Sequence, residues 1–143
     1  MLIDTHSHIY YEKYNDDLDE VIDRAEKNDV KKIICVGTDL KSSIKSLEIS
    51  NKYENVFCTI GYHPHESAKT TENYLNELEK ISGEDKVVGI GETGLDYYYN
   101  HSEPKIQKKR FIEQIELANS LKLPVVVHNR DSDDDLYSIL KKY

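Results

Sequence analysis

The sequence has no apolar run long enough to cross a membrane, and only two of its 143 residues are cysteines. Its first residues carry no basic stretch ahead of an apolar core, so they predict no secretory signal. Cys35 and Cys58 both lie in strand-like apolar runs, where a free thiol packs as a small hydrophobic group. We therefore expect a cytoplasmic protein with two buried thiols and no disulfide.

Basic residues are also scarce, because 19 lysines and arginines stand against 27 aspartates and glutamates, for a formal charge of −8. Nonspecific nucleic-acid binding draws most of its affinity from a basic surface, so this balance disfavours that class of protein. A nucleic-acid enzyme stays open, since bound divalent ions can reverse the local field. The length suits a single domain over residues 1–143.

Apolar, β-branched runs alternate with stretches of helical periodicity along the whole chain. The predicted strands are Leu2–Thr5, Lys32–Val36, Val56–Ile60, Val87–Gly91 and Pro124–His128. The predicted helices cover residues 18–25, a weaker segment around Ile44 and Leu47, residues 74–81, Pro104–Leu121 with Ser102 as N-cap, and Ser132–Tyr143. The continuous apolar character of the strands is typical of parallel strands that are covered on both faces.

Two architectures fit this order, an open doubly wound sheet and part of a (β/α)8 barrel. Polar side chains that suit one site follow or end four of the strands, namely His6, His8, His63, Glu92 and His128. In an open sheet of order 2-1-3-4-5 the first and fifth strands lie roughly 14 Å apart, whereas the ions of a two-metal site lie only about 4 Å apart. A curved wall aims these strand ends at one centre. We therefore predict an α/β fold, a partial TIM-type (β/α)8 barrel with about five βα units.

The strongest chemical signal is the pair His6 and His8, which directly follows an apolar run and Asp4. Side chains of extended backbone alternate between two faces, so both imidazoles point the same way. Two imidazoles aimed together suit a transition metal such as zinc. With the carboxylate of Glu92 and the imidazole of His128 at other strand ends, the pattern predicts the metal centre of an enzyme.

The glycines of the stretch Gly89–Gly94 formally match the pattern of dinucleotide-binding proteins. That motif needs a helix that opens within it, so that the helix N-terminus meets the pyrophosphate. Here residues 95–100 intervene, and the next predicted helix begins only near Pro104. We reject a nucleotide site and expect these glycines to let the strand end pack closely beneath Glu92.

Four motifs occur in order: Asp4-Thr5-His6-Ser7-His8, Gly61-Tyr62-His63-Pro64-His65, Gly91 to Tyr97, and Pro124 to Arg130. Together they resemble the motifs of the TatD family, metal-dependent deoxyribonucleases of the amidohydrolase-like barrel group. The resemblance implies hydrolysis of phosphodiester bonds in DNA with two divalent ions. It implies that His6, His8 and Glu92 bind one ion, and that the catalytic Glu92 bridges to a second ion held by His128. Such ions lower the pKa of bound water, which then attacks phosphorus.

Four further residues are predicted to bind substrate or to support the metal ligands: His63, His65, Asp96 and Arg130. The two histidines would contact phosphate or brace the ligands, or would be plain turn residues beside a proline. Asp96 would orient a ligating histidine or only close an Asx turn. Arg130 would bind phosphate in bidentate fashion or pair with a neighbouring aspartate, Asp131 or Asp133.

Two runs of like residues complete the pattern. The tyrosines of residues 97–99 are suited to stacking on bases, but three adjacent rings cannot share one face, so at least one is expected to pack. The aspartates of residues 133–135 are expected in the first turn of a helix, where negative charge is favourable, rather than at a metal.

The sequence is C-terminally truncated relative to the TatD pattern, since a complete barrel takes about 250 residues. The family's further metal-binding histidine and its late aspartate are absent, which leaves three ligands for the first ion and two for the second. We expect the first site to be the better formed. Two bare strand edges favour self-association.

Several alternatives stay open at this point. The ion could be Mg²⁺, Mn²⁺ or Zn²⁺, because histidine ligands favour the softer ions whereas phosphate chemistry often uses Mg²⁺. The chain could instead be an inactive metal-binding fragment or interaction protein, or another phosphoesterase of the same barrel group. No membrane partner is expected.

Overall fold

The computed structural model describes residues 1–143 as one sheet of five parallel strands in the order β1-β2-β3-β4-β5. The strands are β1 (Leu2–Ser7), β2 (Val30–Val36), β3 (Val56–Ile60), β4 (Val87–Asp96) and β5 (Val125–Arg130). Because sequential strands are neighbours, the sheet has barrel order and not the order 2-1-3-4-5 of an open doubly wound sheet. The predicted partial (β/α)8 barrel is confirmed.

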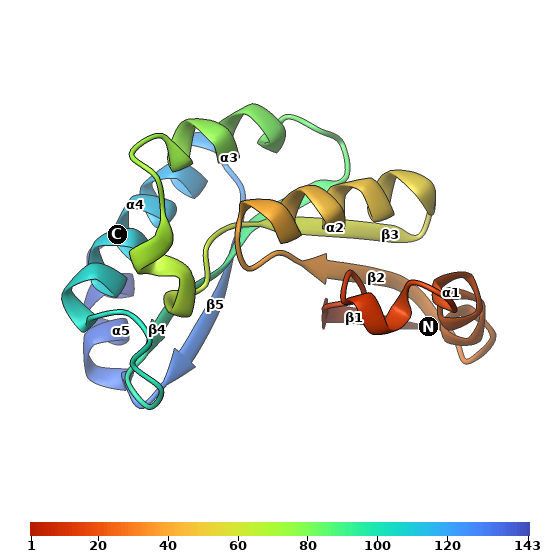
Figure 1. The fold of residues 1–143 in the computed structure, drawn as a ribbon, viewed down its shortest axis with the longest axis horizontal. Coiled ribbons are helices and arrows are strands. Elements are labelled where there is room, and N and C mark those ends of the chain that lie inside the picture. The colour runs from red at the N-terminus through yellow and green to blue at the C-terminus, as the bar shows by residue number, and fades with distance from the viewer.

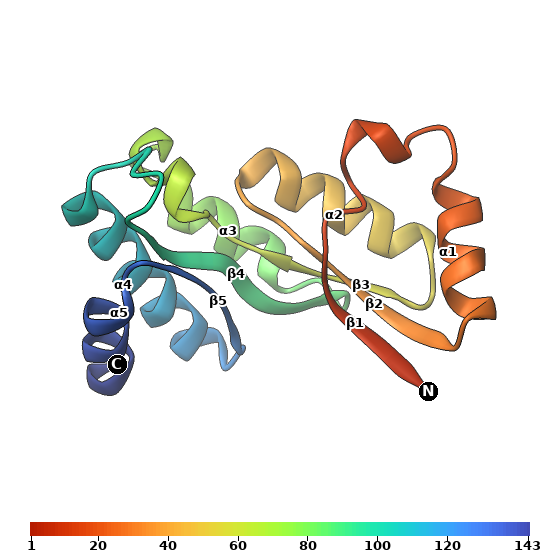
Figure 2. The same cartoon turned by 90° about the horizontal axis from the view of Figure 1, so that it is seen from below.

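Helices connect the strands and cover one side of the sheet. They are α1 (Leu18–Lys27), α2 (Leu40–Lys52), α3 (Tyr74–Ser82), α4 (Pro104–Leu121) and α5 (Asp133–Lys142), with short 3-10 turns η1 (Glu12–Tyr14) and η2 (Pro64–Lys69). Figure 1 shows an arch with the helices on its outer side and the two termini at opposite ends, and Figure 2, seen from below, shows the strands side by side. None of the helices combines the length and the apolar character needed to cross a membrane.

The hydrophobic core lies between the sheet and these helices, in three clusters centred on buried residues such as Ile60, Cys35 and Phe111. The strands at the two ends of the sheet are less buried than those in the middle. β1 is exposed from residue 2 to residue 6, and β5 is only half-buried along its apolar part. Apolar burial is therefore largest in the middle of the arch, which holds β3 and β4 in place.

Some element boundaries differ from the prediction. β4 continues to Asp96, five residues beyond the predicted end, so Glu92 lies inside the strand. The predicted N-cap of α4, Ser102, is wrong, because the helix is capped by Glu103. The Ser102 hydroxyl instead accepts a hydrogen bond from the amide of Ala68 and donates one to the carbonyl of His65. Ser102 therefore ties η2 to the start of α4 rather than capping the helix.

The weak periodicity around Ile44 has a structural explanation. Ile44 itself is exposed, and the face of α2 that packs on the sheet is built mainly from serines: Ser42, Ser43, Ser46 and Ser50. The hydroxyl of Ser43 accepts a hydrogen bond from the amide of Gly61, and a Cβ at Gly37 would lie 2.5 Å from that hydroxyl. Small polar side chains let the helix approach the strand ends closely, at the cost of a clear apolar pattern.

Glycines bring β4 and β5 into close contact beside Glu92. Gly91 and Gly94 have φ angles of +137° and +142°, in the region that side chains disfavour. A Cβ at Gly91 would lie 2.4 Å from the carbonyl oxygen of Val126, and one at Gly94 would lie 2.0 Å from that of His128. The glycines thus serve close packing, as expected, and the element they pack against is β5.

Candidate metal centre

His6, in β1, and His8, just after its end, face Glu92 from across the sheet. The Nε2 atom of His6 lies 3.3 Å from Oε2 of Glu92, and Nε2 of His8 lies 3.7 Å from the same oxygen. The Nδ1 atom of His8 is 2.8 Å from the carbonyl oxygen of Val36, to which it can only donate a proton. This hydrogen bond leaves the lone pair of Nε2 directed at Glu92, which is the tautomer that a metal-binding histidine needs.

Glu92 is almost fully buried and contacts His128 with its other oxygen. Its Oε1 atom lies 3.0 Å from Nδ1 of His128. Burial raises the pKa of Glu92, but the hydrogen bond with His128 and the other neighbouring imidazoles outweigh it, so the net pKa is lowered. The hydrogen bond with Glu92 likewise raises the pKa of His128 against the effect of burial. A buried carboxylate is thus kept ionised by imidazoles on both sides.

Asp96, at the end of β4, holds two histidines with one oxygen. Its Oδ2 atom lies 2.8 Å from Nε2 of His65 and 3.0 Å from Nε2 of His128, and its Oδ1 accepts the amide of Tyr99. Burial raises the pKa of Asp96, but these hydrogen bonds bring it down to about 2. The structure therefore combines both predicted alternatives: Asp96 closes a turn and also fixes the ring of His128, with Nδ1 towards Glu92.

His63 lies beside the same carboxylate, but its hydrogen bonds argue against direct ligation. Its Nε2 atom is 3.8 Å from Oε1 of Glu92, and its Nδ1 accepts the amide of His65 at 3.2 Å. Burial lowers the pKa of His63 to about 4, so the ring is neutral at pH 7. A neutral ring that accepts at Nδ1 carries its proton on Nε2, which makes His63 a hydrogen-bond donor in the pocket rather than a ligand.

Two sets of donor atoms are close enough to hold a cation, and both include Glu92. The atoms of His6, His8 and Glu92 lie within 4.8 Å of one another, as do those of His63, Glu92 and His128. Imidazole nitrogen and carboxylate oxygen suit Zn²⁺ and other transition ions, and a carboxylate can use an oxygen for each of two ions. The residues present therefore fit a divalent metal. The second set is the weaker one because of the tautomer of His63.

Arg130 is not paired with Asp131 or Asp133. Its guanidinium carbon lies 4.1 Å from the ring centre of Tyr98 and 4.6 Å from that of Tyr99. Tyr97, in contrast, is half-buried and donates its hydroxyl hydrogen bond to Asp135, so one of the three tyrosines packs as expected. The aspartates of residues 133–135 occupy the first turn of α5.

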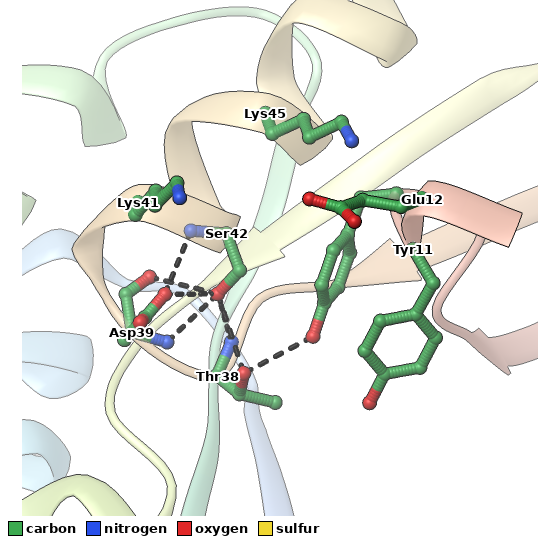
Figure 3. A pocket seen from close by; sticks show the side chains of 8 residues that line it. Tyr11, Glu12, Thr38, Asp39, Lys41, Ser42 and Lys45 are labelled. Carbon is green, nitrogen blue, oxygen red and sulfur yellow. Dashed lines mark hydrogen bonds between the residues drawn. The ribbon is translucent and has the colours of Figure 1, made fainter. Parts of the chain in front are cut away.

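A cavity of about 340 Å³ opens above these residues and includes Arg130, His65 and Tyr99 in its wall. Three of its residues were missed by sequence reasoning: Tyr11, Thr38 and Glu66. Thr38 follows β2, so the search for polar residues at strand ends could have found it. Tyr11 lies in the loop after β1 and Glu66 in the short turn η2, and no periodicity in the sequence signals the position of either. A second cavity adjoins this one and shares Tyr11 and Thr38 with it (Figure 3).

Comparison with known proteins relates the chain to metal-dependent hydrolases. A family model described as TatD related DNase matches residues 3–143. The uncharacterised metal-dependent hydrolase YabD of Bacillus subtilis is 42% identical over 142 residues, which are 99% of this chain and 56% of YabD. A protein of Cronobacter sakazakii named 3′-5′ ssDNA/RNA exonuclease TatD is 37% identical over 128 residues, 90% of this chain and 49% of that protein.

Solved structures give the same relation. The crystal structure of YJJV, a TatD homologue from Escherichia coli K12, matches with a TM-score of 0.92 and 30% identity, over 99% of this chain and 55% of the other. The chain thus spans about half the length of the curated relatives that it matches.

Proposed function

The chain belongs to the TatD-related DNase family, and from this premise we propose that its metal centre hydrolyses phosphodiester bonds in DNA. One observation carries the proposal. Glu92 turns one carboxylate oxygen towards His6 and His8 and the other towards His128. A carboxylate with one oxygen towards each side could serve two divalent ions at the spacing of about 4 Å that two-ion phosphodiesterases use. The name of the Cronobacter relative supports single-stranded substrates as the first to test.

The chain's own residues then take distinct roles. His6, His8 and Glu92 would hold the first ion, and Glu92 with His128 would hold the second. Bound divalent ions supply an acidified water and stabilise the leaving oxygen. Asp96 keeps the Nδ1 atom of His128 facing Glu92.

Two residues of the cavity wall are suited to hold the substrate phosphate. The Nε2–H group of His63 lies beside Glu92 and can donate a hydrogen bond to a phosphate oxygen. Arg130 has its guanidinium held by two tyrosine rings, while no carboxylate competes for its N–H groups. A planar guanidinium in this state is well suited to bidentate phosphate binding.

The test is digestion of a 5′-labelled single-stranded oligonucleotide with Mg²⁺, Mn²⁺ or Zn²⁺ by the wild-type chain, Glu92→Ala and Glu116→Ala. Glu116 is exposed on α4 and serves as the matched control. We expect Glu92→Ala to lose at least about 100-fold in rate, because it removes a ligand of both ions, and Glu116→Ala to match the wild type. Equal digestion by the wild type and Glu92→Ala would contradict the proposal.

Calorimetry with the same metals distinguishes the alternative function. A wild-type chain that binds the metal through Glu92, yet cleaves no DNA, would be a metal-binding interaction protein rather than a nuclease. His6, His8 and Glu92 are by themselves close enough together to hold an ion in that role.

A further inference from the structure

A cavity of about 470 Å³ lies directly beside the metal centre and has no role in the chemistry above. It is bounded by the segment after β1 and by the start of α2 (Figure 3). Tyr11 and Thr38 line both this cavity and the metal pocket and so lie between them. A ligand that extends beyond the metal centre on this side must pass over these two residues. The cavity is therefore placed to receive the next unit of a polymeric substrate.

The charged groups of this cavity leave its lysines available. Asp39 is occupied in capping α2, where its carboxylate accepts the amide of Ser42 at 2.7 Å and the hydroxyl of Ser42 at 2.5 Å. Lys45 donates only to the side-chain oxygen of Asn15, at 3.3 Å, and Lys41 makes no ion pair. Glu12 is the other carboxylate in the wall of the cavity, and its negative charge partly offsets the positive charges of these two lysines.

Tyr11 adds an exposed aromatic ring at the border of the two cavities. Tyr11 is 48% exposed, and its ring centre lies 5.6 Å from that of His8 and 4.8 Å from that of Tyr10. The hydroxyl of Tyr10 lies 3.1 Å from that of Thr38. This hydrogen bond fixes the ring of Tyr10, which is the ring that Tyr11 contacts. An exposed ring next to lysines without an ion-pair partner is a combination with which proteins bind single-stranded nucleic acid.

We propose that this cavity is a strand-binding subsite for single-stranded nucleic acid. Tyr11 stacks on the base of the nucleotide next to the metal centre, while Lys41 and Lys45 contact the adjoining phosphates. The proposal rests on the proposed function for the identity of the ligand. It locates the path of the strand, between β1 and α2, and explains how an acidic chain gains local affinity for a polyanion.

The test is fluorescence anisotropy with fluorescein-labelled octathymidylate in EDTA, at several NaCl concentrations. We expect Lys41→Ala/Lys45→Ala to weaken binding and to lower the magnitude of the salt slope of log K by about 1.4, since each lost single-strand phosphate contact removes about 0.7. Tyr11→Leu should weaken binding by about 5-fold or more. Glu12→Gln should tighten it, because a negative charge facing the strand is removed. Lys80→Ala, an exposed lysine on α3, is the control and should bind as the wild type does.

The sign of the Glu12 effect is decisive. Weaker octathymidylate binding by Glu12→Gln, or wild-type affinity of the double lysine variant, would overturn the subsite. The lysine effect should also be smaller for dithymidylate than for octathymidylate, because the shorter probe cannot span both cavities.

The assay needs neither metal nor turnover, so it is independent of the cleavage test. Lysine-dependent binding without any cleavage would leave the subsite standing and remove the proposed hydrolysis. Cleavage that depends on Glu92, together with unchanged binding by the double lysine variant, would support the proposed hydrolysis and overturn the subsite.

Discussion

At the scale of single residues, the site depends on how a few buried polar groups are paired. Asp96 is fully buried and negatively charged, yet it is compensated by two imidazoles and a backbone amide. The same pairing decides which nitrogen of His128 is free to face Glu92. A side chain that never touches an ion can therefore set the affinity for it.

We predict that Asp96→Asn weakens binding of Zn²⁺ or Mn²⁺ by about 10- to 100-fold, because the ring of His128 loses its carboxylate partner. Isothermal titration calorimetry measures the affinity. Asp135→Asn is the matched control, since the carboxylate of Asp135 also accepts a hydrogen bond, from the hydroxyl of Tyr97, but lies on α5, away from the metal ligands. Equal affinities of the two variants would contradict a role for Asp96 in orienting His128.

A second residue-scale prediction concerns the thiols. Cys35 and Cys58 are unpaired and fully buried, as the sequence led us to expect. Burial raises the pKa of Cys58 to about 11 and raises that of Cys35 above its usual value. A raised pKa means a protonated, unreactive thiol at pH 8, where about one Cys58 in a thousand is ionised. We expect no reaction with Ellman's reagent in the folded state and two reactive thiols in guanidinium chloride. Rapid native reaction would mean that the core opens.

At the scale of elements, α4 holds the strand ends in place through two fully buried glutamines. Gln107 bonds both the amide and the carbonyl of Asp96, at 2.8 Å and 3.0 Å. Gln114 accepts the amide of Tyr62 and donates to the hydroxyl of Thr93, each at 2.7 Å. Buried amides that satisfy backbone groups fix the strand ends on which the site is built.

We predict that Gln114→Leu lowers the free energy of unfolding by about 1–3 kcal/mol for each buried group left without a partner. Asn119→Leu, the same kind of change at an exposed position of α4, should alter it by no more than about 0.5 kcal/mol. Urea denaturation followed by circular dichroism compares the two. A Gln114 variant as stable as the Asn119 variant would remove the anchoring role of this glutamine.

At the scale of the whole molecule, the two edges of the sheet are the distinctive feature. β1 and β5 are the terminal strands of the order, and Leu2 and Ile3 on β1 are 60% and 48% exposed. Strand edges with exposed apolar side chains are templates for pairing with another chain. The concave side of the arch carries no helix that would cover them (Figure 1).

We therefore predict that the chain self-associates and elutes above its mass of 16.6 kDa in size-exclusion chromatography with light scattering. Ile3→Lys should shift the population towards monomer, because a charge on an edge strand disfavours strand pairing. Ile44→Lys, on the exposed side of α2, should leave the assembly unchanged. A wild-type chain that stays monomeric at high concentration would exclude self-association through these edges.

The sequence by itself determined the alternation of strands and helices, the barrel class and the convergence of His6, His8, Glu92 and His128, which the structure brings together. These follow from local periodicity and from the rule that the carboxyl ends of parallel strands meet. Only the tertiary structure decided that Asp96 binds two histidines, that Arg130 lies against tyrosines and that Tyr11 borders the site. Such contacts join segments far apart in sequence, and their partners are chosen by packing and hydrogen bonding, which local patterns do not encode.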